Sequence, residues 1–515
     1  MQHYDYIIIG SGFGGSVSAM RLSEKGYRVL LIEKGRRFED QDYPKSDWQF
    51  WKFLWMPALK WFGFQKINFF RKVLVLSGVG LGGGSNVYAN THMQPETQFF
   101  THPSWGHFKP WLNILPRFYD TARQMLGTTP VPELHREDQI LQEVAADMGA
   151  LNSFKRTEVG VYFGEQEENV DPYFDGKGPK RQACKQCAGC MVGCRHGAKN
   201  TLSKNYLYFA EKAGVEILTL WEADKIEFLE GKYRVHCQSL KGGHSAIYTS
   251  GGLVVAGGVL GTLDLLFKQK IQYKTLPILS DTLGSNVMTN SEMLCGITQI
   301  PEKVNHGVSI SSVFNADPHT HVEIVKYNNE SGLMGRLAVL AAGGGSIGLR
   351  LLKLLGAIIS HPIDFLKSTF GFKNWGEKTI ILLIMQSLEE TLNMEWRKGR
   401  FKGLRFSREK GKRVEAFLPI GQEVMHKYQQ KARGIAQNGI SEVFFNIPTT
   451  AHILGGCPMG EHAEQGVVDA NFKVHGYPNF YILDGSIIPT NPGVNPSLTI
   501  TALSEYAMSQ IPEKN

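Results

Sequence analysis

The first forty residues constrain the fold most strongly, because they combine a strand, a glycine-rich turn, a helix and a second strand. Tyr6 to Ile9 is a short apolar run, and Gly10-Ser11-Gly12-Phe13-Gly14-Gly15 follows it. A helix-like stretch, SVSAMRLSEKG, then leads to an apolar run from Arg28 to Ile32 that ends on Glu33. These elements, in this order around G-x-G-x-x-G, predict a βαβ unit that binds a dinucleotide.

Each part of this motif has a physical role. The first glycine permits the tight turn, and the second lets the backbone approach a pyrophosphate at the helix N-terminus. The third glycine lets the helix pack closely on the strand. Glu33 stands where an acid would accept the ribose hydroxyls, which disfavours a 2′-phosphate. The motif alone does not separate NAD from FAD.

Three further glycine-bearing segments favour FAD. GVGLGGGSN occupies residues 78–86, and AGGVLGT at 256–262 follows an apolar strand. Near the C-terminus, FYILDGS leads to NPGVNPSLT, where Asn495 can cap a long helix and Pro496 suits its first turn. A nicotinamide cofactor does not need glycine loops from four distant segments, whereas an extended flavin dinucleotide does.

Taken in this order, the segments resemble the glucose–methanol–choline (GMC) oxidoreductases, and within them the cholesterol oxidase-like branch. The resemblance covers nearly the whole chain and is most specific in IIIGSGFGG, GLGGGSNVYANT, GCRHGAKNTLSKNYL, AHILGGCPMG and LDGSIIPTNPGVNPSLTITALSE. It implies an α/β fold in which a Rossmann-like FAD-binding domain is interleaved with a substrate-binding domain built on an antiparallel sheet with helices. It also implies oxidation of an alcohol to a carbonyl by hydride transfer to flavin.

The resemblance assigns site residues. His452 matches the family's histidine, and a histidine suits proton acceptance because its pKa lies near neutrality. Asn495 matches a second polar position that hydrogen-bonds the substrate oxygen. The residues expected at the cofactor are Gly10, Gly12, Phe13, Gly14, Gly15, Glu33, Gly83, Ser85, Asn86, Asn90, Ala223, Asp484, Gly485 and Pro496.

The expected substrate is a bulky apolar alcohol, such as a 3-hydroxysteroid like cholesterol. Cholesterol oxidases also isomerise their product with a carboxylate base, and Glu323 in THVEIVKY is one candidate. A solvated strand carboxylate is the favoured interpretation of Glu323. Either molecular oxygen or a redox partner can serve as the electron acceptor, so a flavin and iron–sulfur dehydrogenase is the alternative function.

That alternative comes from CKQCAGCMVGC, in which four of the seven cysteines fall within eleven residues with ferredoxin-like spacing. Cys190 and Cys194 resemble the position where some bacterial GMC dehydrogenases carry an iron–sulfur cluster. Zinc ranks below a cluster because such close spacing leaves little room for a tetrahedral loop. Reduced structural thiols are the favoured interpretation. The candidate ligands are Cys184, Cys187, Cys190 and Cys194.

Two stretches, 48–76 and 334–370, mix apolar and basic residues. The uncharged part between Arg336 and Arg350 has only thirteen residues, too short to span ~30 Å as a helix. The stretches can be core and lid elements of an apolar pocket, or they can dip into a bilayer surface as basic amphipathic helices do. We expect ordinary buried structure for most of them, with peripheral membrane contact as the alternative.

The remaining expectations concern organisation and location. A net charge of +7 is mild, and no motif supports nucleic-acid binding. No secretory signal pattern is visible at the N-terminus, which favours the cytoplasm and reduced thiols. The runs 322–326 and 379–385 are strand-like and fit a sheet over the pocket. We expect the FAD domain at 1–40, 73–100, 195–300 and 446–515, and the substrate domain with covering segments at 41–72, 101–194 and 301–445.

Overall fold

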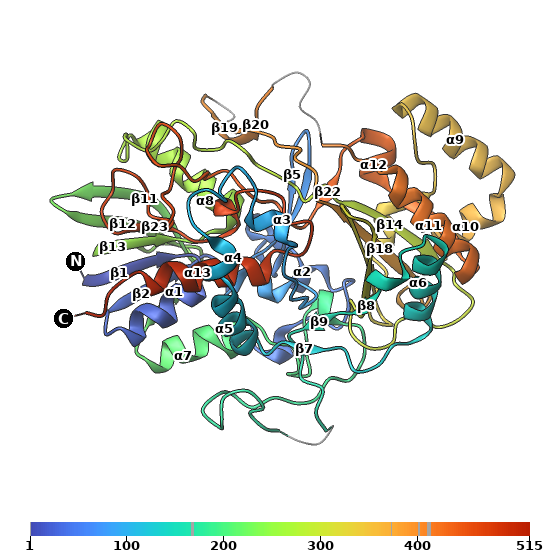
Figure 1. Cartoon of the computed structure of the whole chain (residues 1–515), viewed down its shortest axis with the longest axis horizontal. Coiled ribbons are helices and arrows are strands. Elements are labelled where there is room, and N and C mark those ends of the chain that lie inside the picture. The colour runs from blue at the N-terminus through green and yellow to red at the C-terminus, as the bar shows by residue number, and fades with distance from the viewer. Residues whose placement is uncertain (1, 166–168, 372, 400–401, 409–413, 515) are drawn as a thin grey trace.

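The computed structural model describes residues 2–165, 169–371, 373–399, 402–408 and 414–514, and two seven-stranded sheets organise it (Figure 1). The first sheet lies at the left of Figure 1 near both termini, and the second lies at the right. The first sheet contains β1 (Gln2–Ile9), β2 (Val29–Glu33), β10 (Glu216–Thr219), β11 (Trp221–Leu229), β12 (Lys232–Ser239), β13 (Ser245–Val255) and β23 (Phe480–Ile482).

The centre of the first sheet is parallel. β1 pairs in parallel with β2 and β13, while β10 and β23 pair in parallel with β2 and β13 respectively. These strands carry continuous apolar runs because both of their faces are covered, and Ile7 and Ile8 are completely buried. The predicted βαβ unit is therefore confirmed. Helices α1 (Phe13–Glu24), α5 (Pro116–Leu126), α7 (Tyr206–Lys212) and α13 (Ser497–Ser509) pack side by side, while α8 (Gly258–Phe267) follows β13.

The second sheet is antiparallel. Its strands are β8 (Lys155–Arg156), β14 (Met293–Thr298), β15 (Ser312–Asp317), β16 (Thr320–Val325), β17 (Ala338–Leu340), β18 (Ile380–Gln386) and β21 (Ile435–Gly439). Helices α6 (Arg136–Asp147) and α11 (Pro419–Ala432) pack against it. The strands predicted at 322–326 and 379–385 are thus neighbours, as β16 and β18.

Alternation along β18 shows what each face of this sheet meets. Ile380, Leu382 and Ile384 join the cluster beneath α6 and α11. The intervening Leu383 and Met385 join a second apolar cluster that also contains Phe38, Phe64 and Ala89 from the first part of the chain. The period of two therefore places one apolar face of the sheet against the segment that carries the second glycine loop, which we define as residues 78–91.

Short elements connect the two sheets. β22 (Thr449–Thr450) pairs in parallel with β6 (Leu74–Gly78), which also pairs with β5 (Gln65–Phe69). The remaining strand pairs are β3 (Trp55–Met56) with β4 (Trp61–Phe62), β7 (Thr129–Pro130) with β9 (Glu158–Val159), and β19 (Met394–Arg397) with β20 (Gly403–Phe406). The remaining helices are α2 (Phe50–Phe53), α3 (Thr97–Phe100), α4 (Trp111–Ile114), α9 (Ile347–Ser360), α10 (Pro362–Phe370) and α12 (Ile440–Phe445).

The structure differs from the sequence-based expectations at two places. β14 pairs in the second sheet although it precedes the expected domain boundary at residue 300; the boundary itself stays a prediction. The expectation of buried structure in 334–370 is wrong for its two helices. In α9 only Arg350 and Leu354 are buried, and in α10 only Ser368 is. Within the part of the chain that the structure describes, no helix has the length and apolar content needed to cross a bilayer.

Candidate active site

The carboxyl ends of β1, β2 and β13 meet at one edge of the first sheet, and a cavity of about 150 Å³ lies there. A crevice at this edge is where doubly wound sheets bind nucleotides. The lining is dominated by the glycine loops after β1, β6 and β13. It includes five of the predicted cofactor residues, Gly10, Gly12, Glu33, Gly83 and Ala223, together with Gly78, Gly84, Gly257, Gly258 and Gly261.

Two of these loops approach each other without side chains between them. A Cβ added at Gly83 would lie 2.8 Å from the Cα of Gly12. Gly12 is also the N-cap of α1 and has no side chain that could cap it. The first backbone N–H groups of α1 are therefore left for an anion such as a pyrophosphate. The glycine-lined cavity and this uncapped helix end fit the dinucleotide part of FAD.

Glu33 lies in the cavity wall, and its carboxylate accepts hydrogen bonds that hold the first glycine turn in place. Its Oε2 accepts hydrogen bonds from the Ser11 amide and hydroxyl at 3.1 and 2.7 Å, and its Oε1 accepts one from the Gly35 amide at 2.7 Å. The contact of Glu33 with a ribose stays a prediction. The bonds that are present show how β2 and the first glycine turn are held together.

Several predicted cofactor residues lie behind the cavity and shape it. A Cβ at Gly14 would lie 1.8 Å from the Leu483 carbonyl oxygen, so Gly14 permits α1 to pack on the strand. At Gly15 the Cβ would lie 2.0 Å from the Gly10 carbonyl oxygen. Asn86 uses its whole amide within the protein, donating to Leu81 and Gly83 and accepting from the Tyr43 hydroxyl. These three residues therefore shape the loops around the cavity and are not part of its lining.

The remaining predicted cofactor residues also make contacts within the protein. Ser85 bonds within its loop and to the Leu202 amide, and the Phe13 ring lies edge-on to Tyr88. The Asp484 carboxylate accepts from the Thr262 hydroxyl and the Ser486 amide, and burial raises the pKa of Asp484. A Cβ at Gly485 would touch Val259 and Leu454. Asn90, in the left-handed region, donates to the Gly160 carbonyl but leaves its Oδ1 buried without a partner.

His452 follows β22, and its ring is fixed by a carboxylate. Its Nδ1 lies 2.5 Å from Oε1 of Glu292, whose other oxygen accepts the Ala451 amide at 2.9 Å. Burial alone lowers the pKa of His452, but the negative charge and hydrogen bond of Glu292, with a smaller effect of Glu323, raise it above the usual value. Because Nδ1 is engaged, Nε2 is the nitrogen left to meet a substrate hydroxyl.

The segment 289–292 joins His452 to the predicted Asn495. The Thr450 hydroxyl donates to the Thr289 carbonyl, and the Asn290 amide donates to the Val494 carbonyl at 3.1 Å. Asn495 is nearly buried and its Oδ1 has no partner. Its predicted capping role is wrong, because α13 begins at Ser497 with Pro496 as N-cap and no side-chain capping bond. The amide of Asn495 is therefore left for a bound molecule.

Glu323 is not the solvated carboxylate that the sequence favours, because it is completely buried on β16. One oxygen lies 3.1 Å from Nε2 of His321, whose other ring nitrogen lies 2.8 Å from the Asn315 side chain. The second oxygen of Glu323 has no partner. A buried carboxylate with a free oxygen is costly, which marks this position as one that a ligand or water completes.

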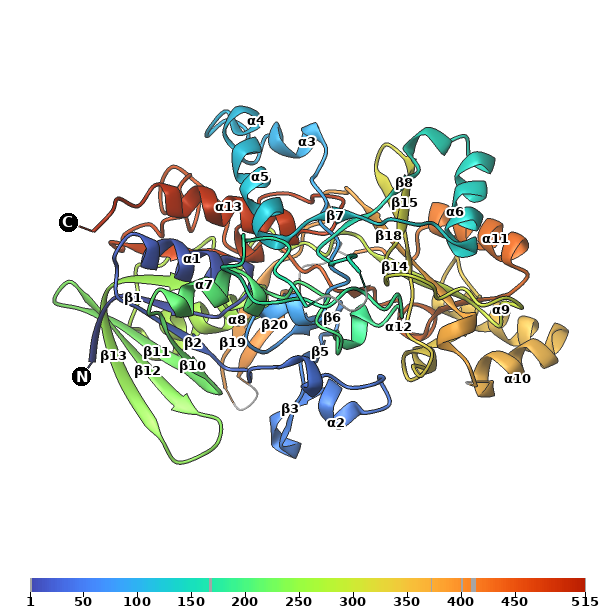
Figure 2. The ribbon, with the colours of Figure 1, turned by 90° about the horizontal axis from the view of Figure 1, so that it is seen from below.

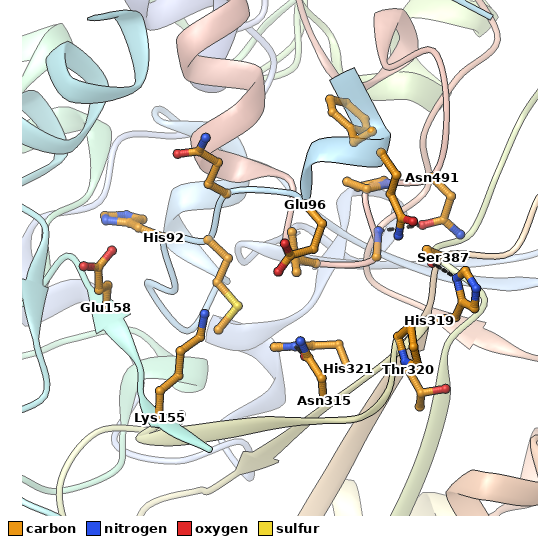
Figure 3. A pocket seen from close by; sticks show the side chains of 18 of the residues that line it. His92, Glu96, Lys155, Glu158, Asn315, His319, Thr320, His321, Ser387 and Asn491 are labelled. Atoms are coloured by element: carbon orange, nitrogen blue, oxygen red, sulfur yellow. Dashed lines mark hydrogen bonds between the residues drawn. The ribbon is translucent and has the colours of Figure 1, made fainter. Parts of the chain in front are cut away.

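A larger cavity of about 270 Å³ borders this network, and Figure 3 shows it. His321 and Asn315 face Glu96 across it, while Asn491 and Ser387 lie at one end. His92 lines it as well, and burial lowers the pKa of His92 to about 3, so this imidazole is neutral. The cavity is largely polar. Its apolar lining includes Met93, Phe99 and Val494, and Val494 precedes Asn495 in the chain.

Sequence reasoning missed Glu292 and Asn290. Both stand in a short link before β14, and Asn290 and Ser291 have left-handed backbones that turn the chain there. An asparagine in such a conformation is a weak turn signal. The pairing of Glu292 with His452 joins residues 160 positions apart, and no local pattern in the sequence announces it.

The cysteine run does not form the predicted ligand set. Cys187 is exposed and Cys190 is buried, with left-handed backbones at Gln186 and Ala188 between the first three cysteines. Over the ranges that the structure describes, no three or more His, Cys, Asp or Glu side chains are arranged to hold a metal ion. The geometry thus supports neither the cluster nor zinc.

The run is instead tied to the second glycine loop through Lys199. This lysine is 1% exposed, and its ammonium donates to the carbonyls of Asn86, Tyr88 and Cys190 at 3.0, 2.7 and 3.1 Å. Arg195 donates to the carbonyls of Gln41 and Tyr43. The cysteine segment therefore braces the loop that lines the nucleotide cavity.

The sequence matches known families and relatives. Residues 179–288 and 397–504 match family models described as GMC oxidoreductase, and residues 8–38 match an NAD(P)-binding Rossmann-like domain. The chain is 38% identical to a cholesterol oxidase of Acinetobacter baumannii, over 99% of this chain and 95% of the relative. It is 40% identical to a cholesterol oxidase of Mycobacterium tuberculosis, over 99% of this chain and 91% of the relative.

Solved structures show the same fold at low identity. A pyridoxine 4-oxidase from Mesorbium loti superposes with a TM-score of 0.63 at 15% identity, covering 98% of both chains. A fungal aryl-alcohol oxidase superposes with a TM-score of 0.59 at 14% identity, covering 99% of this chain and 98% of that one. These structural neighbours share the overall fold of this chain.

Proposed function

This chain belongs to the GMC oxidoreductase family, in its cholesterol oxidase-like branch, and is an FAD-dependent oxidoreductase acting on CH–OH groups; from this premise we propose that its substrate is a bulky apolar alcohol of the 3-hydroxysteroid class, such as cholesterol. The relatives named cholesterol oxidase support the substrate class. The observation that carries the proposal is the pairing of His452 with Glu292, because a carboxylate that holds Nδ1 prepares the imidazole to act as a base.

His452 accepts the hydroxyl proton in this proposal. The hydrogen bond of Nδ1 to Glu292 holds the tautomer whose Nε2 is unprotonated and open to the substrate. As the proton arrives at Nε2, the imidazole becomes positive, and the nearby carboxylate stabilises that charge. Glu292 is therefore a positioning residue, and its charge explains why the pKa of His452 is raised.

Asn495 orients the alcohol. Its buried amide has an unpartnered oxygen and stands at the start of α13. Its side-chain NH₂ donates to the substrate oxygen, so that the hydroxyl proton points to His452 and the reacting C–H points toward the cofactor. When bound, the flavin supplies the hydride acceptor.

The apolar part of the lining of the larger cavity suits the body of such a substrate. It includes Met93, Phe99 on α3 and Val494 beside Asn495. A sterol has one hydroxyl on a large apolar skeleton, so it needs one polar end and one apolar wall. The site residues offer the polar end, and these apolar side chains offer part of the wall.

We take molecular oxygen as the final acceptor. The two electrons and two protons removed from one alcohol reduce one O₂ to one H₂O₂, so the reaction balances without a protein partner. The names of the relatives, which are oxidases, favour this acceptor. The alternative flavin and iron–sulfur dehydrogenase has no support from the cysteine geometry in the described ranges.

The buried Glu323 favours a second step, isomerisation of the ketone product. Its unpartnered oxygen can remove a proton from a carbon next to the new carbonyl and return it at another carbon, which moves the double bond into conjugation. In the variant Glu323→Gln we expect alcohol oxidation to continue while the unconjugated ketone accumulates. A conjugated product at the wild-type rate would remove Glu323 from this role.

One experiment tests the main proposal. The holoprotein is mixed with cholesterol without air, and flavin absorbance is followed; we expect it to bleach and then to recover with H₂O₂ on admission of air. His452→Gln should slow bleaching by roughly 10²–10⁴-fold, whereas His426→Gln on the exposed side of α11 should not. Absence of bleaching with any sterol would overturn the substrate class, and an unchanged rate in His452→Gln would overturn the base.

A further inference from the structure

Helices α9 and α10 expose large apolar side chains on the face that points away from the body of the protein. In α9, Arg350 and Leu354 face the body, and the opposite face carries Leu352, Leu355 and Ile359 at exposures of 67%, 54% and 71%. These three positions are spaced as i, i+3 and i+7, so they form one stripe. A helix on a water-exposed surface normally turns such a stripe toward the core.

The following helix repeats the pattern. In α10, Ile363, Leu366 and Phe370 are 64%, 54% and 66% exposed, again at i, i+3 and i+7. Both helices therefore present a stripe of large apolar side chains outward. We call residues 346–370 the apolar hairpin. Figures 1 and 2 show it at the outer end of the molecule, beyond the second sheet and far from both termini.

The apolar hairpin has an excess of positive charge, with three basic residues and one acid. Lys353 and Lys367 are exposed, whereas Asp364 is the only acid from residue 346 to residue 370. Exposed lysines flanking an apolar stripe complement the anionic headgroups of a lipid surface while the stripe enters the acyl region. The positive charges beside the stripes therefore favour a lipid bilayer over a partner whose surface is apolar alone.

The apolar hairpin is joined to α12 by side-chain contacts of α9. The guanidinium of Arg350 donates to the Glu442 carbonyl at 2.6 Å and to the Asn446 side chain at 2.5 Å, both on or just after α12. Leu354 joins a small apolar cluster with Leu340 and Val443. With 14 and 9 residues, α9 and α10 are each shorter than the ~20 needed to cross a membrane, so they would lie in its plane.

We propose that the apolar hairpin docks this protein on the surface of a lipid bilayer, with the stripes of α9 and α10 inserted at the headgroup boundary. The proposal goes beyond the proposed reaction and stands on the exposed faces alone. It also has a consequence for a lipid-borne substrate: α12, which Arg350 anchors, leads within a few residues to β22 and His452. Docking therefore places the substrate domain against the membrane.

Vesicle binding without turnover tests the proposal. The holoprotein is floated with vesicles of phosphatidylcholine, and of phosphatidylcholine mixed with phosphatidylglycerol. We expect binding to both, stronger to the anionic mixture and weakened by salt in that case. In the variant Leu352→Glu/Ile359→Glu we expect affinity to fall at least about tenfold, because two apolar side chains no longer insert.

Controls separate docking from misfolding and from dimerisation. Leu229→Glu places the same change at a 45% exposed leucine on β11, in the other sheet, and should bind vesicles as the wild type does. Flavin content and circular dichroism confirm folding of each variant. The proposal is overturned if the wild type floats with neither vesicle, or if the double variant floats equally well. It is also overturned if light scattering finds a dimer that the double variant breaks and vesicles do not bind. Soluble alcohol turnover reports the proposed reaction separately.

Discussion

Two carboxylates act on His452, and only one of them touches it. Glu292 bonds Nδ1 directly and is 1% exposed. Glu323 contacts His321 instead and affects His452 through its charge. Removing the charge of Glu292 while keeping an oxygen acceptor therefore separates positioning from electrostatics.

Glu292→Gln should shift the pH dependence of the reaction. A proton acceptor works only when unprotonated, so kcat/KM falls as the pH drops through the pKa of His452. Glu292 raises that pKa; without its charge the acid limb should move to lower pH. We also expect kcat to fall at least about tenfold, because the imidazolium formed in the transition state loses its counter-charge. Rates of flavin reduction against pH give both quantities.

A matched control for this variant is Glu442→Gln. Burial raises the pKa of Glu442 to about 8, so this carboxyl is largely neutral near pH 7 and glutamine mimics it. The acid limb should stay in place in this variant. A limb that is unmoved in Glu292→Gln would contradict the electrostatic effect of Glu292 on the pKa of His452, whatever the loss of rate.

A second prediction at the residue scale concerns Lys199. In Lys199→Met, three buried carbonyls lose their donor, and each unsatisfied group costs about 1–3 kcal/mol. We expect the free energy of unfolding to fall by at least ~3 kcal/mol and FAD to be released more readily, since two of the carbonyls belong to the second glycine loop. Urea denaturation and flavin fluorescence measure these, with the exposed Lys155→Met as control. Unchanged flavin release would show that the brace does not support the cofactor loop.

At the scale of elements, the first glycine turn carries two separable functions. A Cβ at Gly12 would meet no protein atom closer than 4.0 Å, yet Gly12 lines the nucleotide cavity. A Cβ at Gly14 would collide with the Leu483 carbonyl at 1.8 Å. The same chemical change two residues apart therefore tests cofactor space at one position and helix packing at the other.

We expect Gly12→Ala to fold and to bind FAD weakly, and Gly14→Ala to lose stability in the presence and absence of FAD. Unfolding midpoints of the apo and holo forms, with FAD titration, check both. Gly356→Ala in the exposed part of α9, where a Cβ meets nothing within 4 Å, should be neutral or slightly stabilising. Normal FAD affinity in Gly12→Ala would mean that the cofactor does not use this cavity.

The same elements show how far sequence reasoning reaches. The glycine turns and the strands before them are local patterns, so the nucleotide-binding sheet and the strands β16 and β18 could be predicted. The pairing of Glu292 with His452 depends on a turn at Asn290 and Ser291 and on a contact distant in sequence, which no periodicity encodes. In α9 the apolar content was visible, but burial follows from packing partners, and α9 has few.

At the scale of the whole molecule, the two ends of the chain close the FAD domain together. α13 packs against α1, and every residue from Ser497 to Met508 is buried. The Arg21 guanidinium of α1 donates two hydrogen bonds, of 2.7 and 2.8 Å, to the Glu505 carboxylate of α13. The Tyr206 hydroxyl donates a third to the same carboxylate at 2.6 Å. The pair joins residues 484 positions apart, so it forms only when the chain ends meet.

Breaking this pair should therefore destabilise the folded domain as a unit. In Arg21→Met the Glu505 carboxylate, only 5% exposed, is left buried without its cation, which typically costs about 3–5 kcal/mol. The double variant Arg21→Met/Glu505→Gln removes both charges and keeps a partner for Tyr206, so it should recover most of that loss. Urea unfolding of the holoprotein measures all three chains. A double variant as unstable as Arg21→Met would show that the packing of α1 on α13, rather than the buried charge, depends on Arg21.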